Sequence, residues 1–315
     1  MAENVTVVGY GAVGRETVKL LADRGDKVRV AQRSRPRGLR PEAEFVPVDV
    51  LNPESLVNAS AGSEAVICCL GFPYDSRVWQ KTWPKAMANL LSACEKAKAR
   101  FIFADNLYMY GPQTAPLSES TPLQPVGVKP AARVAATRIW MAASQAGRLR
   151  VAALRAPDFY GPGVIQAHLG DTAFGALARG GRAQFIGSPD TPHDFAYVPD
   201  CARAVVSLLD APDDAYGQAW HAPSAPIRTP RQILALGAAA IGVAPRAIGL
   251  PTVLLGPLGL FVPPLRELAE MRFQWDRPYL VDSSRFAKRF WADATPFEIG
   301  APATARWFRD RVGAR

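Results

Sequence analysis

The chain has 315 residues, of which 49% are apolar and 21% are charged, the balance of a globular protein with one or two domains and a sizeable core. The longest apolar stretches, such as 251–265, are too short and too rich in Pro and Gly to span a bilayer. The first residues enter a strand pattern with no basic and then apolar leader. We therefore expect a cytoplasmic protein without a membrane partner.

The net charge and the few cysteine and histidine residues indicate which partners and metals to expect. The net charge is +9, but the basic residues are scattered and no stacking aromatics interleave with them, so we expect no nucleic acid partner. The four cysteines and three histidines show no zinc-site spacing. We expect no metal, and buried, reduced thiols as in cytosolic proteins.

The most informative segment is "NVTVVGYGAVGRETVKLLADRGDKVRVAQRS". A short strand ends in a glycine turn, and a helix and a second strand follow, the order of a βαβ unit. Gly9 permits the tight turn, Gly11 lets the backbone approach a pyrophosphate, and Gly14 lets the helix pack closely. The helix N-terminus adds N–H donors for phosphate. The residues predicted to bind the pyrophosphate are Gly9, Gly11, Ala12, Val13 and Gly14.

The end of the second strand predicts which dinucleotide is preferred. NAD sites usually place an acid there, for the ribose 2′-hydroxyl, but this chain has Gln32, followed by Arg33, Ser34 and Arg35. Guanidinium and hydroxyl groups suit a 2′-phosphate, which favours NADP and a preference for NADPH over NADH. The alternative is a solvated basic loop.

Further strands and helices alternate along the first half. Strands are expected over 43–50, 64–71 and 100–105, with helices starting at Asn52 or Pro53 and spanning 83–99. This alternation predicts an α/β fold, a Rossmann-type doubly wound parallel sheet with a smaller C-terminal substrate lobe. Ligands bind such sheets at the carboxyl ends of the strands.

An ordered series of motifs resembles the extended short-chain dehydrogenase/reductase family, of the NAD(P)-dependent epimerase/dehydratase type. After the glycine turn come "VDVLNPESL", "CCLG", "FIFADNLYMYGP", "TPLQPVGVKPAARVAA", "LRAPDFYGPG" and "HDFAYVPDCARAVVSLL", covering about the first 210 residues. The resemblance implies that Asp49 and Val50 contact adenine, and that Leu70, Gly71 and Pro157 line the cofactor pocket.

The family's Tyr-x-x-x-Lys pair does not carry over. In that family the tyrosine is the proton donor, and the lysine lowers its pKa and binds the ribose. Here the tyrosine position falls on Val126 and the lysine position on Pro130, with Lys129 one residue short. No tyrosine occurs between 110 and 160, and the family's serine position holds Asn106.

Three residues are predicted to replace these catalytic groups. The Asn106 amide can donate a hydrogen bond to a substrate oxygen, and Tyr108 can supply a phenol. Lys129 reaches the cofactor ribose if the chain near Pro130 accommodates a one-residue shift relative to the family's lysine position. Alternatively, Asn and Tyr here serve only the turn and the core, as we expect for Tyr110.

The second half contributes the expected substrate residues, Asp158, Phe159 and His193. Alternatively, Asp158 forms a turn or a helix cap, and His193 faces solvent or is hydrogen-bonded. Sugar-nucleotide epimerases of this type usually have an arginine at the position of His193 to hold the diphosphate, so a nucleotide sugar is disfavoured.

The expected domains are an NADP-binding Rossmann domain over 1–158, to which 184–222 adds a strand and a helix, and a substrate lobe over 159–183 and 223–315. Asp200 and Thr229 are expected to cap helices. The segment "RPYLVDSSRFAKRF" is expected to form a strand and a helix.

Three functions remain open, in order of preference. The first is NADPH-dependent reduction of a small or medium apolar carbonyl or imine compound by hydride transfer. The second is an epimerase or dehydratase that regenerates its nicotinamide within one turnover. The third is a non-catalytic NADP-binding sensor. A homodimer through the 83–99 helix is a further possibility.

Overall fold

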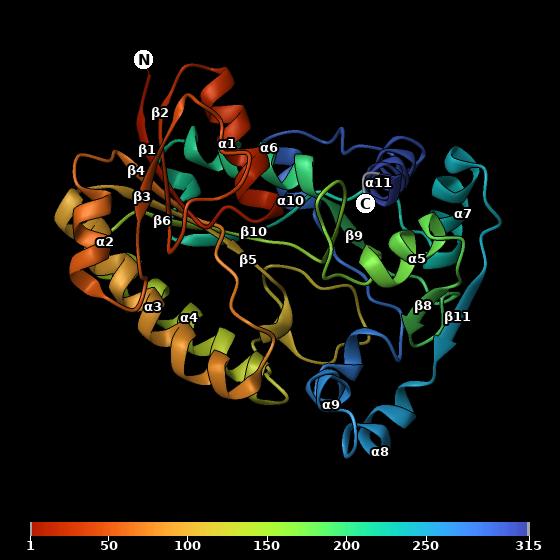
Figure 1. Ribbon diagram of the computed structural model, residues 1–315. Coiled ribbons are helices and arrows are strands. Elements are labelled where there is room, and N and C mark those ends of the chain that lie inside the picture. The colour runs from red at the N-terminus through yellow and green to blue at the C-terminus, as the bar shows by residue number, and fades with distance from the viewer. Residues whose placement is uncertain (1, 314–315) are drawn as a thin grey trace. The chain divides into compact units, whose positions relative to one another are not determined.

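The computed structural model describes residues 2–313 and divides the chain into two compact units (Figure 1). The first unit comprises the chain up to Met109, Val128–Arg155 and Cys201–Trp220, and the second comprises the rest. Of the ranges assigned to the Rossmann domain, residues 110–127, 156–158, 184–200 and 221–222 thus belong to the second unit.

The first unit is built on a parallel sheet with the strand order β10-β6-β5-β4-β1-β2-β3, seven strands within residues 2–313. The strand order reverses at β1, which pairs in parallel with both β2 and β4. This Rossmann arrangement confirms the predicted fold class. The strands are β1 (Asn4–Val8), β2 (Lys27–Gln32), β3 (Ala43–Pro47), β4 (Ala65–Cys68), β5 (Arg100–Asp105), β6 (Val151–Arg155) and β10 (Gln218–His221).

Helices cover both faces of this sheet. Figure 1 shows α3 and α4 running side by side below the sheet and α1 above it. On the face covered by α2, α3 and α4, apolar side chains form a core rich in aromatic rings, including Trp83, Trp140, Phe101 and Phe103. The helices are α1 (Ala12–Asp23), α2 (Pro53–Ser60), α3 (Ser76–Ala97), α4 (Val128–Gln145) and α6 (Val198–Leu209).

Two helix starts test the sequence predictions. Helix α2 starts as predicted, with the Asn52 side chain accepting from the N–H groups of Glu54 and Ser55 and Pro53 in its first turn. Helix α3 was predicted from 83 but starts at Ser76, because the Asp75 carboxylate caps it and Pro84 lies inside the helix. A proline inside a helix removes one hydrogen bond without necessarily ending it.

The second unit has two small parallel sheets, β7 (Asp158–Tyr160) with β9 (Phe195–Tyr197) and β8 (Ala183–Ile186) with β11 (Ala247–Leu250). Its core lies between α7 and α11, where Gly237 leaves room for the Phe174 ring. The helices of this unit are α5 (Ala176–Ala178), α7 (Pro230–Ile241), α8 (Leu255–Gly259), α9 (Pro263–Ala269), α10 (Ser284–Arg289) and α11 (Phe297–Gly313).

Three local predictions in this half have different outcomes. Thr229 caps α7 in a capping box with Gln232, as predicted. Asp200 does not cap α6 but lies in its first turn, where its carboxylate accepts from the N–H and the hydroxyl of Thr295. The strand predicted near 280 is reduced to isolated bridges at Tyr279 and Val281, and α10 follows.

The predicted absence of a transmembrane segment can be compared with the helices of residues 2–313. None of them is both long and apolar enough to cross a bilayer.

Candidate functional site

The glycine turn after β1 is shaped by two close contacts. Gly9 has φ +95°, and a Cβ there would lie 2.9 Å from the Cys69 carbonyl oxygen. A Cβ on Gly14 would lie 2.1 Å from the Gly9 carbonyl oxygen, so α1 can approach β1 only with glycine at this position. Around Gly11, by contrast, no other heavy atom lies within 4 Å of an added Cβ. Packing therefore explains Gly9 and Gly14, and Gly11 faces open space.

Helix α1 also begins without a side-chain cap. Its N-cap residue is Gly11, whereas Asn52, Asp75 and Thr229 cap α2, α3 and α7 with side-chain oxygens. The first N–H groups of an uncapped helix are donors for an anion, and the helix dipole favours negative charge there. Ala12, Val13 and Gly14 form this first turn. The open approach at Gly11 and the uncapped amides together fit the pyrophosphate of a dinucleotide.

Gln32, at the end of β2, connects this turn to the basic loop. Its Oε1 accepts from the Tyr10 N–H at 3.1 Å, and its Nε2 donates to the Ser34 carbonyl oxygen at 2.7 Å. Arg33, Ser34 and Arg35 are exposed. Neither Arg33 nor Arg35 is ion-paired within the described part of the chain, so both guanidinium groups remain available to an anion.

The remaining predicted cofactor residues of this unit lie after β3 and β4. Leu70 is beside the glycine turn, with its Cα 3.1 Å from the Cβ position of Gly9, and Gly71 follows it at the surface. Asp49 is exposed, and its carboxylate accepts from the Leu51 N–H at 2.9 Å. Val50 is buried. The carboxyl ends of β1 and β4 thus meet where the strand order reverses, which is where Rossmann-type sheets bind ligands.

The predicted catalytic turn after β5 is held by hydrogen bonds from its backbone N–H groups to its own side chains. The Asn106 N–H donates to the Asp105 carboxylate at 2.7 Å, and Asn106 Oδ1 accepts from the Tyr108 N–H at 3.2 Å. The amide oxygen of Asn106 is thus used by the turn, and its NH₂ group is the part able to meet a ligand. Tyr110, as expected, is structural: it is fully buried and hydrogen-bonded to His221 in the second unit.

Lys129 lies in the first turn of α4 and is completely buried. Its Nζ donates to Ser76 Oγ at 3.1 Å and lies 4.6 Å from the centre of the Tyr74 ring. Tyr74 packs edge-on against Trp79, and the Trp79 ring also stacks with Tyr108 at a centroid distance of 5.9 Å. Lys129, Tyr74, Trp79 and Tyr108 therefore form one contiguous group, which we call the Lys129 cluster.

Sequence reasoning missed Tyr74 and Trp79. Tyr74 stands in "LGFPYDS", three residues beyond Gly71, at the edge of the sheet where ligands bind. An aromatic so close to a strand's carboxyl end was the available signal. The structure also shows where the two positions of the family's Tyr-x-x-x-Lys pair would fall. Helix α4 starts at Val128, so Val126, at the tyrosine position, precedes the helix and is exposed, whereas Lys129 lies in the first turn.

A buried ion cluster lies beneath the turn. The Asp105 carboxylate pairs with the Arg133 guanidinium and lies 3.6 Å from Arg155 Nε. Arg133 faces the ring of Trp83 at 4.0 Å, a cation–π contact. Arg133 follows Lys129 by one helical turn, so both project from the same face of α4. Sequence reasoning missed Arg133 because nothing local pairs it with Asp105.

The predicted substrate residues lie in the second unit, where Phe159 is partly exposed; Pro157, predicted to line the cofactor pocket, is buried in the same unit. His193 Nε2 is 3.1 Å from Asp158 Oδ2, and the His193 ring stacks with Tyr279 and His168. Burial would raise the pKa of Asp158, but the hydrogen bond and charge of His193 outweigh it, and the pKa is lowered. His193 thus has a satisfied, buried position, the alternative left open by the sequence.

Two neighbours of this pair have strongly shifted pKa values. Burial, with help from His193, lowers the pKa of His168 to about 3, and burial raises the pKa of Asp194 to about 6. The space between His168, His193 and Trp275 is about 10 Å³, which is too small for a substrate.

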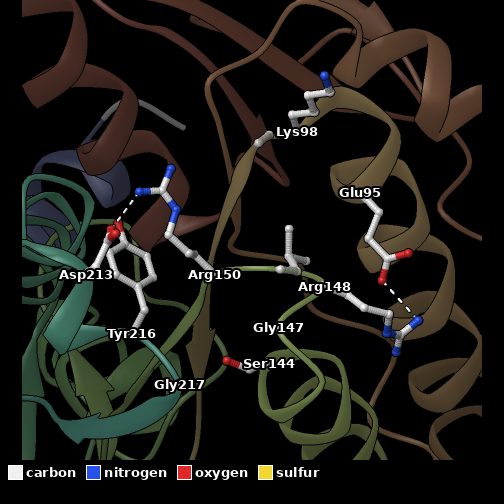
Figure 2. Close-up of a pocket in the computed structure, with 11 residues that line it drawn as sticks. Glu95, Lys98, Ser144, Gly147, Arg148, Arg150, Asp213, Tyr216 and Gly217 are labelled. Carbon is white, nitrogen blue, oxygen red and sulfur yellow. Dashed lines mark hydrogen bonds and ion pairs between the residues drawn. The ribbon is translucent and has the colours of Figure 1, made fainter.

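A larger cavity of about 520 Å³ opens in the first unit (Figure 2). It lies at the amino ends of β5 and β6, so in this parallel sheet it faces away from the glycine turn. Figure 2 shows that two of its cations are already paired, Arg148 with Glu95 at 3.2 Å and Arg150 with Asp213 at 2.7 Å. This cavity is not part of the dinucleotide site.

The sheet order and the glycine turn place the chain in the Rossmann-type class of α/β proteins. The profile of the NAD dependent epimerase/dehydratase family matches residues 5–221. The chain belongs to that family, which confirms the resemblance drawn from its motifs.

Solved structures with the same fold cover 98–99% of this chain and 98–99% of their own. One is DesIV, a dTDP-glucose 4,6-dehydratase from Streptomyces venezuelae with NAD bound (TM-score 0.81, 19% identity). Others are the Bordetella bronchiseptica enzyme WbmH in complex with NAD+ (0.77, 20%) and UDP-glucuronic acid 4-epimerase from Bacillus cereus in complex with NAD (0.77, 17%). A search of curated proteins finds no match.

The glycine turn yields a test that separates ligand binding from folding. Gly11→Val should leave the thermal unfolding temperature nearly unchanged, because the added side chain meets no protein atom. It should weaken NADPH and NADH binding at least about tenfold, since it fills the approach to the helix N-terminus. Gly14→Ala should instead destabilise the fold by about 1–3 kcal/mol, as overpacked sites do. Calorimetric titration and circular dichroism melting check both variants; unimpaired binding by Gly11→Val would contradict this site.

The low pKa of His168 predicts a pH dependence of stability. The folded imidazole stays neutral down to about pH 3, whereas the unfolded one gains a proton below about 6.5. Stability should therefore fall as pH decreases from 6.5. His168→Phe should remove about 2 kcal/mol of the loss between pH 7 and pH 5. Urea unfolding of both proteins at the two pH values measures this; equal losses would show that His168 is not the titrating group.

Proposed function

We propose that this protein is a nicotinamide-dependent enzyme of epimerase or dehydratase type, in which the cofactor is used and regenerated within one turnover. The observation that carries this is the pairing, within one compact unit, of an uncapped glycine turn and a buried lysine–tyrosine contact at Lys129 and Tyr74. Family membership and NAD in the complexes of similar fold support the cofactor class.

The proposed dinucleotide contacts follow the edge of the sheet. The first amides of α1, at Ala12, Val13 and Gly14, hold the pyrophosphate. Arg33, Ser34 and Arg35 bind a ribose 2′-phosphate, since no acid stands there to repel it. The residues proposed at the adenine and along the rest of the pocket are Asp49, Val50, Leu70, Gly71 and Pro157.

When bound, the nicotinamide supplies hydride acceptance and donation. Lys129 is proposed to stabilise the negative charge that develops on a nearby phenol during proton transfer, because a desolvated ammonium acts strongly at short range. We place that phenol on Tyr74, which contacts the ammonium, with Tyr108 as the alternative predicted from the sequence. The Asn106 NH₂ is proposed to donate to the substrate oxygen.

The substrate is proposed to be a small or medium apolar alcohol or carbonyl compound. Enzymes of similar fold include ones named for dTDP-glucose and UDP-glucuronic acid. In this chain the position that would carry a diphosphate-binding arginine holds His193, which is buried and bonded to Asp158. Asp158 and Phe159 remain partly exposed and are proposed to contact the substrate.

A second candidate is net NADPH-dependent reduction of an apolar carbonyl or imine. One observation favours it: Gln32, Arg33 and Arg35 replace the acid expected of an NAD site, and both guanidinium groups lack a carboxylate partner in residues 2–313. A preference for NADPH suits a reaction that consumes its cofactor.

Isotope tracing separates the two functions. The protein is incubated with a panel of apolar alcohols, ketones and imines, either with substoichiometric NADP⁺ or with excess 4-deuterated NADPH. Internal regeneration predicts many turnovers per cofactor, no net change in nicotinamide absorbance, and no label in the product. Net reduction predicts cofactor consumption matching product, with deuterium on carbon. Cofactor binding with neither outcome across the panel would favour the non-catalytic sensor.

The phenol is assigned by two variants once a substrate is found. Tyr74→Phe should lower kcat by about 10²-fold or more, the usual contribution of a positioned acid or base, with cofactor affinity unchanged. Tyr108→Phe should stay within about threefold, because it keeps the ring that stacks on Trp79. Tyr216→Phe, at the opposite edge of the sheet, is the control. The reverse order of effects would return the role to Tyr108.

A further inference from the structure

The second unit carries a contiguous apolar surface on two short helices. The segment from η4 (Thr252–Leu254) through α8 and α9 forms a hairpin in which α8 packs against α9; Figure 1 shows the two helices side by side. Its exposed side chains include Phe261 (84% exposed), Leu260 (81%) and Val253 (72%). Further members of this surface, which we call the hairpin tip, are Leu254, Leu258 and Val262.

The inner face of the hairpin is tightly packed. Leu255 is fully buried and points inward, and Gly259 lets α8 cross α9, since a Cβ there would lie 2.8 Å from the Arg266 backbone. With its inner face closed, the hairpin presents the tip residues to solvent. Exposed apolar groups on this scale mark an interaction surface rather than an ordinary scatter of surface residues.

The charges around the tip are arranged by sign. Residues 247–265 contain no charged side chain; in the sequence the exposed Arg246 precedes this stretch, and the exposed Arg266 and Arg272 follow it. The acids of α9 and its end, Glu267 and Glu270, are only partly exposed, and the Glu270 carboxylate lies against Gly127. The exposed charged residues that flank the tip in the sequence are therefore cationic, on a chain of net charge +9, and Arg266 lies against Gly259 of α8.

We propose that the hairpin tip binds an anionic lipid surface, with Leu260, Phe261 and Val262 entering the headgroup boundary and Arg246 and Arg266 meeting lipid phosphates. A second copy of the chain fits less well, because it would bring like-charged arginine borders together. The attachment is peripheral, since no helix in the described residues can span a bilayer. This inference is independent of the proposed function, and it revises the expectation of no membrane partner.

Vesicle flotation tests the proposal. The full chain should float with phosphatidylcholine vesicles that contain phosphatidylglycerol, and far less with phosphatidylcholine alone. The double variant Leu260→Ser/Phe261→Ser should lose at least about tenfold in bound fraction. Ile299→Ser is the matched control, because Ile299 is 62% exposed on α11 of the same unit. Arg246→Gln/Arg266→Gln should weaken the preference for the anionic vesicles.

Three results would contradict the proposal. Failure of the wild-type chain to float, flotation of the serine variant like the wild type, or equal flotation on neutral vesicles would overturn the proposal. Light scattering after size exclusion tests the other occupant: a dimer that the serine variant converts to monomer would make the tip an interface between copies. Unchanged circular dichroism melting of both double variants ensures that lost binding is not lost folding.

Discussion

The carboxylate of Asp105, buried at the end of β5, connects more of the first unit than any other polar group described above. It pairs with Arg133 of α4, approaches Arg155 at the end of β6, and accepts from the N–H of Asn106. A charge removed from water is tolerated only when its partners are close, and loss of one partner destabilises by several kcal/mol. Asp105 therefore fixes the end of β5 relative to α4.

Lys129 and Arg133 are one turn apart on the same face of α4, so positioning one positions the other. The ammonium of Lys129 is held against Ser76 and Tyr74 because Arg133 ties the same helix to the sheet. The Arg133 guanidinium lies over the buried rings of Trp79 and Trp83, and the Lys129 ammonium is itself completely buried. Exclusion of water is what makes charge effective at a reaction centre.

The sequence was informative for several local features, although it missed the Asp75 cap of α3. The glycine turn, the alternation of strands and helices, and the caps at Asn52 and Thr229 each depend on neighbours within a few residues, and each was predicted. The contact of Lys129 with Tyr74 joins residues that are 55 positions apart in the sequence, and no local sequence pattern predicts it. The same holds for the pairing of β7 with β9, which assigns residues 195–197 to the second unit.

Gln32 has a meaning beyond the absence of an acid. Its amide holds the Tyr10 N–H with oxygen and the Ser34 carbonyl with nitrogen, so one side chain stiffens both the phosphate turn and the basic loop. A carboxylate at this position would keep the first bond and set two oxygens against each other at the second. Re-engineering the cofactor preference by a single exchange at Gln32 would thus loosen the loop that carries Arg33 and Arg35. The cofactor selectivity and the rigidity of the basic loop both depend on Gln32. A redesign of the selectivity must therefore supply a new hydrogen-bond donor to the Ser34 carbonyl oxygen.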